Sequence, residues 1–218
     1  MLDKSIPYQH IYMIRGPVTE TVTPQLPQGY TLRTFRDGDR DHWAAIETSV
    51  AEFENVEKAQ AYFDRAYAPY ADELSRRCVF ACDPDGVPVA TASAWWSEGE
   101  FGRLGMVHWV SVNPAHQGKG LGKAVMHRVL QLFTETEPGL PIMLHTQTWS
   151  HIAVRMYLSL GFCPLCDVSP VAAENKFDSA VKVLTSVMND REVQAFVQCA
   201  VSADSYLSNS GPCPKEDL

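Results

Sequence analysis

Three glycines stand at every second position in Gly118, Gly120 and Gly122, directly after an apolar stretch of the chain. Glycine adopts positive φ angles without steric cost and lets the backbone approach a ligand closely. The first amides of a following helix have no acceptor within the helix, and together with the helix dipole they attract an anion. Lys119 and Lys123 add positive charge to the same segment. This spacing predicts a loop that binds a phosphate-bearing ligand.

Two common phosphate-binding loops do not fit this spacing. A Walker loop needs a glycine five residues before its Gly-Lys pair and a serine or threonine after it. The pair Gly122 and Lys123 has Gln117 at the first of these positions, and Ala124 follows it. A dinucleotide-binding loop needs a third glycine three residues beyond the second, where this chain has Lys123 after Gly120. Both classes are therefore excluded.

A third pattern, Gln/Arg-x-x-Gly-x-Gly behind a strand that ends in Val-Asn-Pro, is met by Gln117, Gly120 and Gly122. In this segment the chain resembles the GNAT-type N-acetyltransferases. A second signature of that superfamily, which closes with Tyr-x-x-x-Gly-Phe, is similar to residues 144–162, where Tyr157 precedes Gly161 and Phe162. The close resemblance covers residues 105–162, residues 29–96 follow the family in a looser pattern, and the chain beyond residue 164 has no match.

The resemblance implies an α/β fold of the α+β type, with a central mixed, mostly antiparallel sheet flanked by helices. An additional N-terminal strand and C-terminal helices complete the expected architecture. A single GNAT-like domain is expected over residues 1–218. Its parts are an N-terminal strand and connector (1–28), an acetyltransferase core (29–165), a helical extension (166–201) and a polar tail (202–218).

The resemblance also implies the binding of acetyl-CoA as co-substrate. In the family, backbone amides of the glycine loop hold the diphosphate, and the strand before the loop binds the pantetheine arm through backbone hydrogen bonds. An amide of that strand, near Val110, would polarise the thioester carbonyl. Ser150 occupies a position where many family members have an asparagine that contacts the coenzyme. The residues expected to bind the coenzyme are Val110, Ser111, Val112, Gln117, Gly118, Lys119, Gly120, Leu121, Gly122, Lys123 and Ser150.

Acetyl transfer to an amine requires an acid for the leaving thiolate and a base for the amine. Tyr157 matches the tyrosine whose hydroxyl faces the coenzyme sulfur in the family, and it is the expected acid. His108 is the expected base, because serotonin N-acetyltransferase-like members have a catalytic histidine at the matching strand position. Met106, two residues earlier, stands where other members carry a titratable side chain and cannot titrate itself. The other candidates for the base are His145, Glu52 and Glu54.

Periodicity and turn signals predict the elements that carry these residues. Strands are predicted at residues 9–15, 30–35, 78–82, 87–96, 105–112 and 141–148. Helices are predicted at residues 40–50, after Asn55, from 121, and at 151–160, 174–187 and 190–201, followed by a loose polar tail. Alternation along residues 105–112 places His108 on one face of its strand and both Trp109 and Ser111 on the other. The strand near the N-terminus is expected to take the place in the sheet of a late strand that the family usually has.

Composition limits the function further. The chain of 218 residues is 45% hydrophobic and carries a formal net charge of -8, with a pI near 5.3. An acidic protein lacks the positive surface that binds nucleic acid, so a nucleic-acid partner is not expected. No segment has the roughly 20 apolar residues of a membrane span, and the N-terminus lacks the layout of a signal peptide, so a cytoplasmic protein without a membrane partner is expected.

The six cysteines are expected to be free thiols, and Cys163 and Cys166 lack the two further ligands of a zinc site, so no metal is expected.

The sequence thus favours direct transfer of an acetyl group, in a ternary complex, to the primary amine of a small molecule rather than of a protein. Two alternatives stay open: the same fold using another acyl-CoA or an alcohol acceptor, and a non-catalytic CoA-binding protein. Many relatives dimerise, and an apolar face at Phe177, Val181 and Leu184 would serve either a homodimer or packing onto the same chain.

Overall fold

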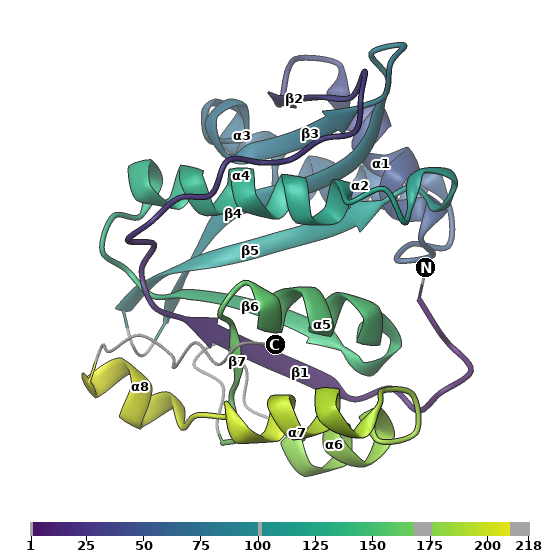
Figure 1. The fold of residues 1–218 in the computed structure, drawn as a ribbon. Coiled ribbons are helices and arrows are strands. Elements are labelled where there is room, and N and C mark those ends of the chain that lie inside the picture. Colours follow the sequence, from purple (N-terminus) through teal and green to yellow (C-terminus); the bar gives the residue numbers. More distant parts are fainter. Residues whose placement is uncertain (1, 100–101, 168–175, 210–218) are drawn as a thin grey trace. The chain divides into compact units, whose positions relative to one another are not determined.

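The computed structural model describes residues 2–99, 102–167 and 176–209. The chain forms two compact units, and the strands β4 (Pro88–Gly99) and β5 (Gly102–Val112) belong partly to each (Figure 1). The first unit comprises Met1–Leu2, Val18–Trp95 and Val107–Pro138, and the second comprises Asp3–Pro17, Trp96–Met106 and Gly139–Leu218.

A seven-stranded mixed sheet has the strand order β2-β3-β4-β5-β6-β1-β7. Its remaining strands are β1 (His10–Arg15), β2 (Thr31–Thr34), β3 (Cys78–Cys82), β6 (Ile142–Gln147) and β7 (Cys163–Pro164). The pairs β2–β3, β3–β4, β1–β6 and β1–β7 are antiparallel. The predicted fold class, a mixed and mostly antiparallel sheet flanked by helices, is confirmed.

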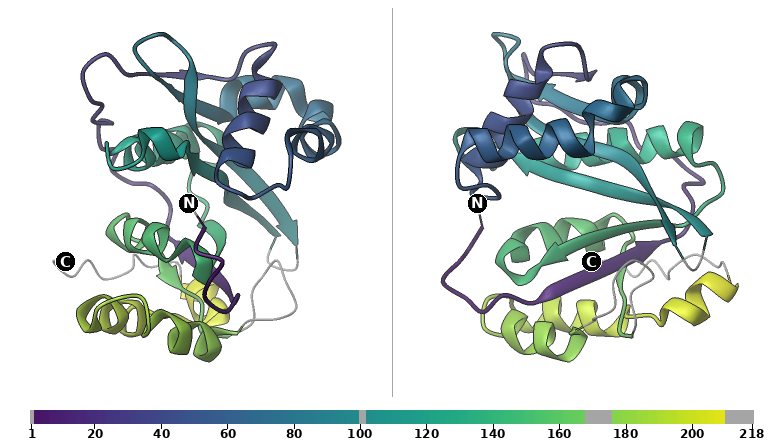
Figure 2. Two further views of the ribbon diagram at one scale, coloured as in Figure 1. Left: turned by 90° about the vertical axis from the view of Figure 1, so that its right-hand side faces the viewer. Right: turned by 180° about the vertical axis from the view of Figure 1, so that it is seen from behind.

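In the first unit, α4 lies on one face of the strands, and α1 and α2 lie side by side on the other (Figure 2). Its helices are α1 (Asp39–Ser49), α2 (Val56–Ala66), α3 (Ala71–Arg77) and α4 (Leu121–Thr136), with short 3-10 turns η1 (Ala68–Tyr70) and η2 (Pro114–His116). Asn55 caps α2 as predicted, because its side chain accepts a hydrogen bond from the Lys58 amide at 2.9 Å. Helix α3 was not predicted, since its seven residues are too few to show a helical period.

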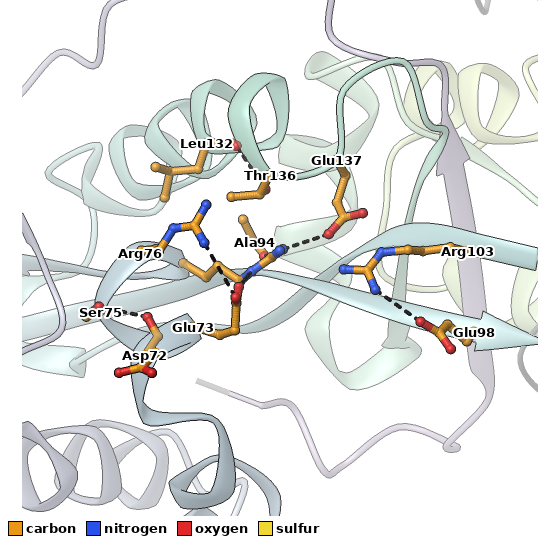
Figure 3. Close-up of polar contacts among 11 residues, drawn as sticks. Asp72, Glu73, Ser75, Arg76, Ala94, Glu98, Arg103, Leu132, Thr136 and Glu137 are labelled. Atoms are coloured by element: carbon orange, nitrogen blue, oxygen red, sulfur yellow. Dashed lines mark hydrogen bonds and ion pairs between the residues drawn. The ribbon is translucent and has the colours of Figure 1, made fainter.

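A buried ion pair fixes the carboxyl-terminal end of α4 (Figure 3). The Arg77 guanidinium donates through Nη1 to Glu137 Oε1 at 2.9 Å and to the Ala94 carbonyl at 3.0 Å, and through Nε to Glu73. The side chains of Arg77 and Glu137 are 4% and 2% exposed. This pair joins α3, β4 and the end of α4, whose other end carries the glycine loop. The network therefore holds the helix on which the loop depends.

In the second unit, β1 lies between β6 and β7. Its register with β6 runs from His10 opposite Gln147 to Arg15 opposite Ile142. The prediction that the early strand enters the sheet is confirmed. The helices of this unit are α5 (His151–Ser159), α6 (Phe177–Leu184), α7 (Asp190–Gln198) and α8 (Ala203–Asn209), with a 3-10 turn η3 (Thr148–Ser150).

Helices α6 and α7 lie side by side (Figure 2), at the positions that the sequence predicts. The apolar face of α6 packs within the unit, because Leu184 is fully buried and the Phe177 ring stacks on Phe196 at 5.7 Å between centroids. The beginning of the predicted helix, up to residue 175, lies outside the described residues. The face proposed for either a homodimer or the chain's own packing is thus used, in part, by the chain itself.

Two expectations for the second unit were wrong. The segment predicted as a loose tail contains α8, where Ala203 and Tyr206 are spaced to pack into a cluster with Tyr12 and Ile14. The polar residues between them hid this period, and residues 210–218 lie outside the described ranges. Cys163 is disulfide-bonded, so the expectation of six free thiols fails at this position. The free cysteines among the described residues are Cys78, Cys82, Cys166 and Cys199.

Within the described ranges, no helix combines the length and apolar composition needed to cross a membrane. The same ranges contain no group of three or more histidine, cysteine, aspartate or glutamate side chains arranged to hold a metal ion.

Candidate active site

The glycine loop joins β5 to α4 in the first unit, and three hydrogen bonds fix its entry. The Asn113 amide donates to the Val89 carbonyl at 2.8 Å, and the Asn113 side chain accepts from the Ala115 amide at 3.0 Å. Gln117 Nε2 reaches back to the Val112 carbonyl at 3.0 Å. The glutamine of the signature therefore anchors the loop to the end of the strand through its side chain.

Gly118 and Gly120 have φ angles of +73° and +80°, which L-residues with a side chain rarely adopt. A Cβ atom at either position would meet nothing within 4 Å, so open space surrounds both. Gly120 is the N-cap of α4 and supplies no side-chain acceptor to the first amides of this 16-residue helix. These amides and the open space beside them fit a diphosphate group.

Tyr30 supports the basic side chains of the loop, a role for which the sequence carries no signal. Lys119 Nζ donates to the Tyr30 hydroxyl at 3.0 Å and lies over the Tyr30 ring at 5.5 Å from its centroid. The Tyr30 hydroxyl is also 3.0 Å from His116 Nδ1. Lys123, in the first turn of α4, is exposed. The loop thus presents positive charge to solvent beside its open amides.

The alternation predicted for β5 breaks at Trp109, whose φ angle is +51°. A strand residue in this conformation no longer sends its side chain to the face opposite both of its neighbours. His108 contacts Tyr67, which follows α2, and Trp109 packs on Trp43 of α1 at 5.5 Å between ring centroids. Both side chains therefore reach the layer of α1 and α2, and the predicted division of His108 from Trp109 was wrong.

His108 lies among aromatic side chains. Its Nδ1 is 3.1 Å from the hydroxyl of buried Tyr67, and the ring of Trp95 stacks on it at 6.3 Å between centroids. Burial lowers the pKa of His108 to about 4, and burial raises the pKa of Tyr67 well above its ordinary value. His108 is therefore neutral at pH 7, with its Nδ1 engaged by Tyr67.

Glu47 is a buried carboxyl group on α1 that the sequence analysis missed. Its side chain is 0% exposed, and Ser111 Oγ of β5 donates to Glu47 Oε2 at 2.8 Å. Burial raises the pKa of Glu47 to about 8, and the nearby negative charge of Glu52 adds to this rise, whereas the Ser111 hydrogen bond opposes it. The signal available in the sequence was its position four residues after Trp43 on the apolar face of the predicted helix.

The contact with Glu47 also restricts the role predicted for Ser111. Its side chain is 6% exposed and is turned towards α1. Only backbone groups of Ser111 are then left to bind a coenzyme arm, which is the kind of contact that the resemblance implies for this strand.

Tyr157 and Ser150 belong to the second unit. Tyr157 lies on α5 and is 6% exposed, its ring meets Phe162 edge-on at 6.2 Å, and its carbonyl accepts the Phe162 amide at 3.0 Å. The last two residues of the Tyr-x-x-x-Gly-Phe signature thus end the helix and pack against its tyrosine. Ser150 precedes α5 and makes no side-chain cap to this helix.

The other candidates for the base have different surroundings. His145 Nε2 is 2.8 Å from His10 Nδ1, in the second unit. Exposed Glu54 pairs with Lys58 at the start of α2. Glu52 is exposed and its amide donates to the Glu47 carbonyl at 3.1 Å. The charge of Glu52 acts on the Glu47 carboxyl group, which links this candidate to the cluster of Glu47 and Ser111.

Comparison with known protein families decides the class of the chain. The model of the acetyltransferase (GNAT) family matches residues 42–162, which is more than half of the sequence and includes the glycine loop and Tyr157. The chain belongs to the GNAT family. The resemblance inferred from the two signatures is therefore confirmed.

Individual relatives agree with this assignment. A mycothiol acetyltransferase of Thermobispora bispora is 30% identical over 161 residues, which cover 70% of this chain and 53% of the relative. This GNAT chain spans about half the length of the curated relatives it matches.

Solved structures show the same fold. A GCN5-related N-acetyltransferase from Sphaerobacter thermophilus has a TM-score of 0.51 at 19% identity and covers 65% of this chain and 43% of its own. A GNAT-family acetyltransferase from Colwellia psychrerythraea has a TM-score of 0.52 at 12% identity and covers 72% of this chain and 54% of its own.

Proposed function

We propose that this GNAT protein transfers an acetyl group from acetyl-CoA to the primary amine of a small molecule, by direct transfer in a ternary complex. The observation that carries the proposal is the loop at Gly118 and Gly120, with positive φ angles, open surroundings and uncapped helix amides. The name of the relative, mycothiol acetyltransferase, supports acetyl transfer as the reaction. The net charge of -8 favours a cationic acceptor over an anionic one.

Acetyl-CoA would supply an activated thioester, and the chain would bind it through two segments. Amides of residues 118–123 would hold the diphosphate, with Lys119 and Lys123 adding charge. Backbone groups of Val110, Ser111 and Val112 would bind the arm that ends in the thioester. Ser150 stays a proposed coenzyme contact on the strength of the family signature alone.

His108 is the proposed acceptor for the proton that the nitrogen loses after it attacks the thioester. In the tautomer with hydrogen on Nδ1, the ring donates to the Tyr67 oxygen and Nε2 keeps its lone pair. A nitrogen bonded to the tetrahedral carbon is a far stronger acid than a free alkylammonium ion, so a base weaker than the free amine can take this proton.

Tyr157 is the proposed acid for the leaving thiolate. We expect Tyr157→Phe to lower kcat about 100-fold, because general acid catalysis contributes at least this factor, and to leave the Kd of acetyl-CoA unchanged. Steady-state kinetics and calorimetry measure the two quantities. The exposed Tyr70, changed to Phe, is the matched control. A kcat within a factor of two of wild type would reject the acid role.

The coenzyme site is tested by a pair of glycine variants. Gly120→Ala and Gly86→Ala place the same Cβ at φ angles of +80° and +82°, each with open space around it. Both should lose about 1 kcal/mol of stability. Only Gly120→Ala should weaken acetyl-CoA binding, by about tenfold, since Gly86 lies in a hairpin turn between β3 and β4. Equal Kd values for the two variants in calorimetry would contradict a loop-bound diphosphate.

The reaction itself is tested by thiol release from acetyl-CoA with 2-phenylethylamine, ethanolamine, glucosamine and cysteine methyl ester. Release with at least one amine, and mass spectrometry showing the N-acetyl product, are expected. Propionyl-CoA, butyryl-CoA and 2-phenylethanol, offered in parallel, identify a different acyl group or an alcohol acceptor. Tight binding of acetyl-CoA with no product from any acceptor would overturn the proposed function in favour of a CoA-binding protein.

A further inference from the structure

Three buried polar atoms on α1 have no hydrogen-bond partner among the described residues: Oε1 of Glu47, an acceptor, Nε1 of Trp43, a donor, and Oγ1 of Thr48. Glu47 and Trp43 are the fully buried residues of the three. Both side chains are 0% exposed, and they stand one helical turn apart on the same face of α1. Buried polar groups in native proteins are nearly always hydrogen-bonded. Glu47 Oε1 and Trp43 Nε1 therefore need hydrogen-bond partners that the described residues do not supply.

Aromatic rings surround the Trp43 side chain. The ring of Trp43 lies 5.9 Å from Phe53, 6.1 Å from Tyr62 and 5.5 Å from Trp109, measured between centroids. Trp109 also packs on Phe53 at 5.3 Å and on Tyr62 at 5.0 Å. The Glu47 carboxyl group stands one helical turn from this aromatic cluster. A carboxylate and aromatic ring faces are the groups that recognise an organic ammonium ion, because the face of each ring carries negative charge density.

The positive φ angle of Trp109 contributes to this arrangement, since it turns the indole towards α1 and α2. Ala51, between α1 and α2, also has a positive φ of 67° and begins the segment that carries Phe53. A non-glycine residue in this conformation costs free energy, and such strain concentrates at ligand-binding sites. Both strained positions therefore lie in segments that carry rings of the aromatic cluster.

We propose that Glu47 binds the amino group of the acceptor at its Oε1 and takes the first proton from it, with Trp43 and the aromatic ring of Trp109 beside it. This inference rests on the proposed acetyl transfer and names the residue that recognises the amino group of the acceptor. Ser111 is the positioning residue, because its hydroxyl occupies Oε2 and leaves Oε1 to the ammonium ion.

The chemistry of amide formation gives this carboxylate a task that His108 does not perform. An alkylammonium ion must lose one proton before its nitrogen has a lone pair, and the nitrogen must lose a second proton after the N–C bond forms and before the C–S bond breaks. Glu47 would receive the first proton and His108 the second, while the sulfur takes a proton from Tyr157. One of the two protons replaces that of Tyr157, and the other leaves to solvent with the amide product.

The surroundings of the two bases suit these two tasks. Burial raises the pKa of Glu47 to about 8, closer to that of an alkylammonium ion, and lowers that of His108 to about 4. Two titratable groups with pKa values displaced in opposite directions are a recurrent sign of divided acid–base roles. Ser111 donates to the Glu47 carboxyl group, which also interacts electrostatically with Glu52, Tyr67 and Cys78.

The test compares Glu47→Gln, Glu47→Asp and the exposed control Glu57→Gln, using the amine of the panel above that the wild type acetylates fastest. For the wild type, kcat/KM for the amine should rise with pH and level off above about pH 8. Glu47→Gln should raise the KM of the amine at least tenfold at pH 8 and abolish this rise, with the KM of acetyl-CoA unchanged. Glu47→Asp should restore part of the pH dependence, and Glu57→Gln should match the wild type.

A binding measurement separates recognition from turnover. Calorimetry of the same amine against the protein saturated with CoA should give a Kd at least tenfold weaker for Glu47→Gln, and 2-phenylethanol should bind both proteins equally. Profiles and Kd values of Glu47→Gln that superimpose on those of an active wild type would overturn this inference alone. A wild type that releases no thiol with any amine would instead overturn the proposed function, and the role of Glu47 with it.

Discussion

We expect the Glu47→Gln variant to gain stability relative to the wild type as the pH rises from about 5 to 8. Burial raises the pKa of Glu47 from its ordinary value of 4.5 to about 8 in the folded chain. Between these values the folded protein keeps a proton that the unfolded chain has lost. The free energy of unfolding therefore falls with rising pH, by up to about 1.4 kcal/mol per pH unit for a single group.

The whole effect is on the order of 5 kcal/mol, since the folded pKa of about 8 and the unfolded pKa of 4.5 differ by about 3.5. The free energy of unfolding of the wild type is at its full value below the unfolded pKa of Glu47. It falls as the pH rises, until the pH has passed the folded pKa of this group. Glutamine has nearly the same shape, does not titrate, and still accepts the hydrogen bond from Ser111 Oγ through its carbonyl. Urea unfolding at several pH values, with Glu57→Gln as the exposed control, measures the slopes. Parallel slopes for Glu47→Gln and the wild type would show that Glu47 titrates normally in the folded state.

The second large effect concerns the buried pair of Arg77 and Glu137. Glu137→Ala should lower the free energy of unfolding by about 3 kcal/mol, because it leaves the Arg77 charge buried with less compensation. Glu73, which also accepts from Arg77, retains part of the pairing and limits the loss. Urea unfolding at pH 7 provides the measurement.

The double variant Arg77→Met with Glu137→Leu is the control for this prediction. Replacing both charges by apolar side chains removes the unpaired charge as well, so the double variant should be more stable than Glu137→Ala. A Glu137→Ala variant as stable as the wild type would mean that the pair with Arg77 makes no net contribution to stability. Because this pair holds the end of α4, acetyl-CoA binding by Glu137→Ala is a further readout of the connection to the loop.

The parts of the fold that follow from local patterns were predicted well from the sequence. Strand β3, helix α5 and the glycine loop depend on alternation, helical period and turn residues within a few positions of one another. Helix α3 and helix α8 were missed, because each has only seven residues and owes its stability to packing. The break in alternation at Trp109 has no signature in the sequence, since tryptophan rarely takes a positive φ angle.

In the candidate site, too, some residues follow from local sequence patterns and others only from the tertiary structure. The loop residues and Tyr157 follow from signatures with fixed spacing, and their roles stay predictions. Glu47 was missed although it stands four residues after Trp43, because a glutamate on a helix is ordinarily exposed, and the tertiary structure shows that it is buried beside Ser111. Tyr30 is equally hidden, since its contact with Lys119 joins residues far apart in the chain.

The position of β1 also has a consequence for how the protein is made. Residues 10–15 leave the ribosome long before their main partner in the sheet, β6, which comprises residues 142–147. Pairs so distant in sequence form late, because the entropy of closing the long intervening loop must first be overcome. During synthesis the apolar side chains of Ile11, Met13 and Ile14 therefore stay without their partner until β6 has emerged. Exposed apolar surface of this kind is prone to aggregate, so we expect the second unit to be most vulnerable to aggregation before β6 is complete.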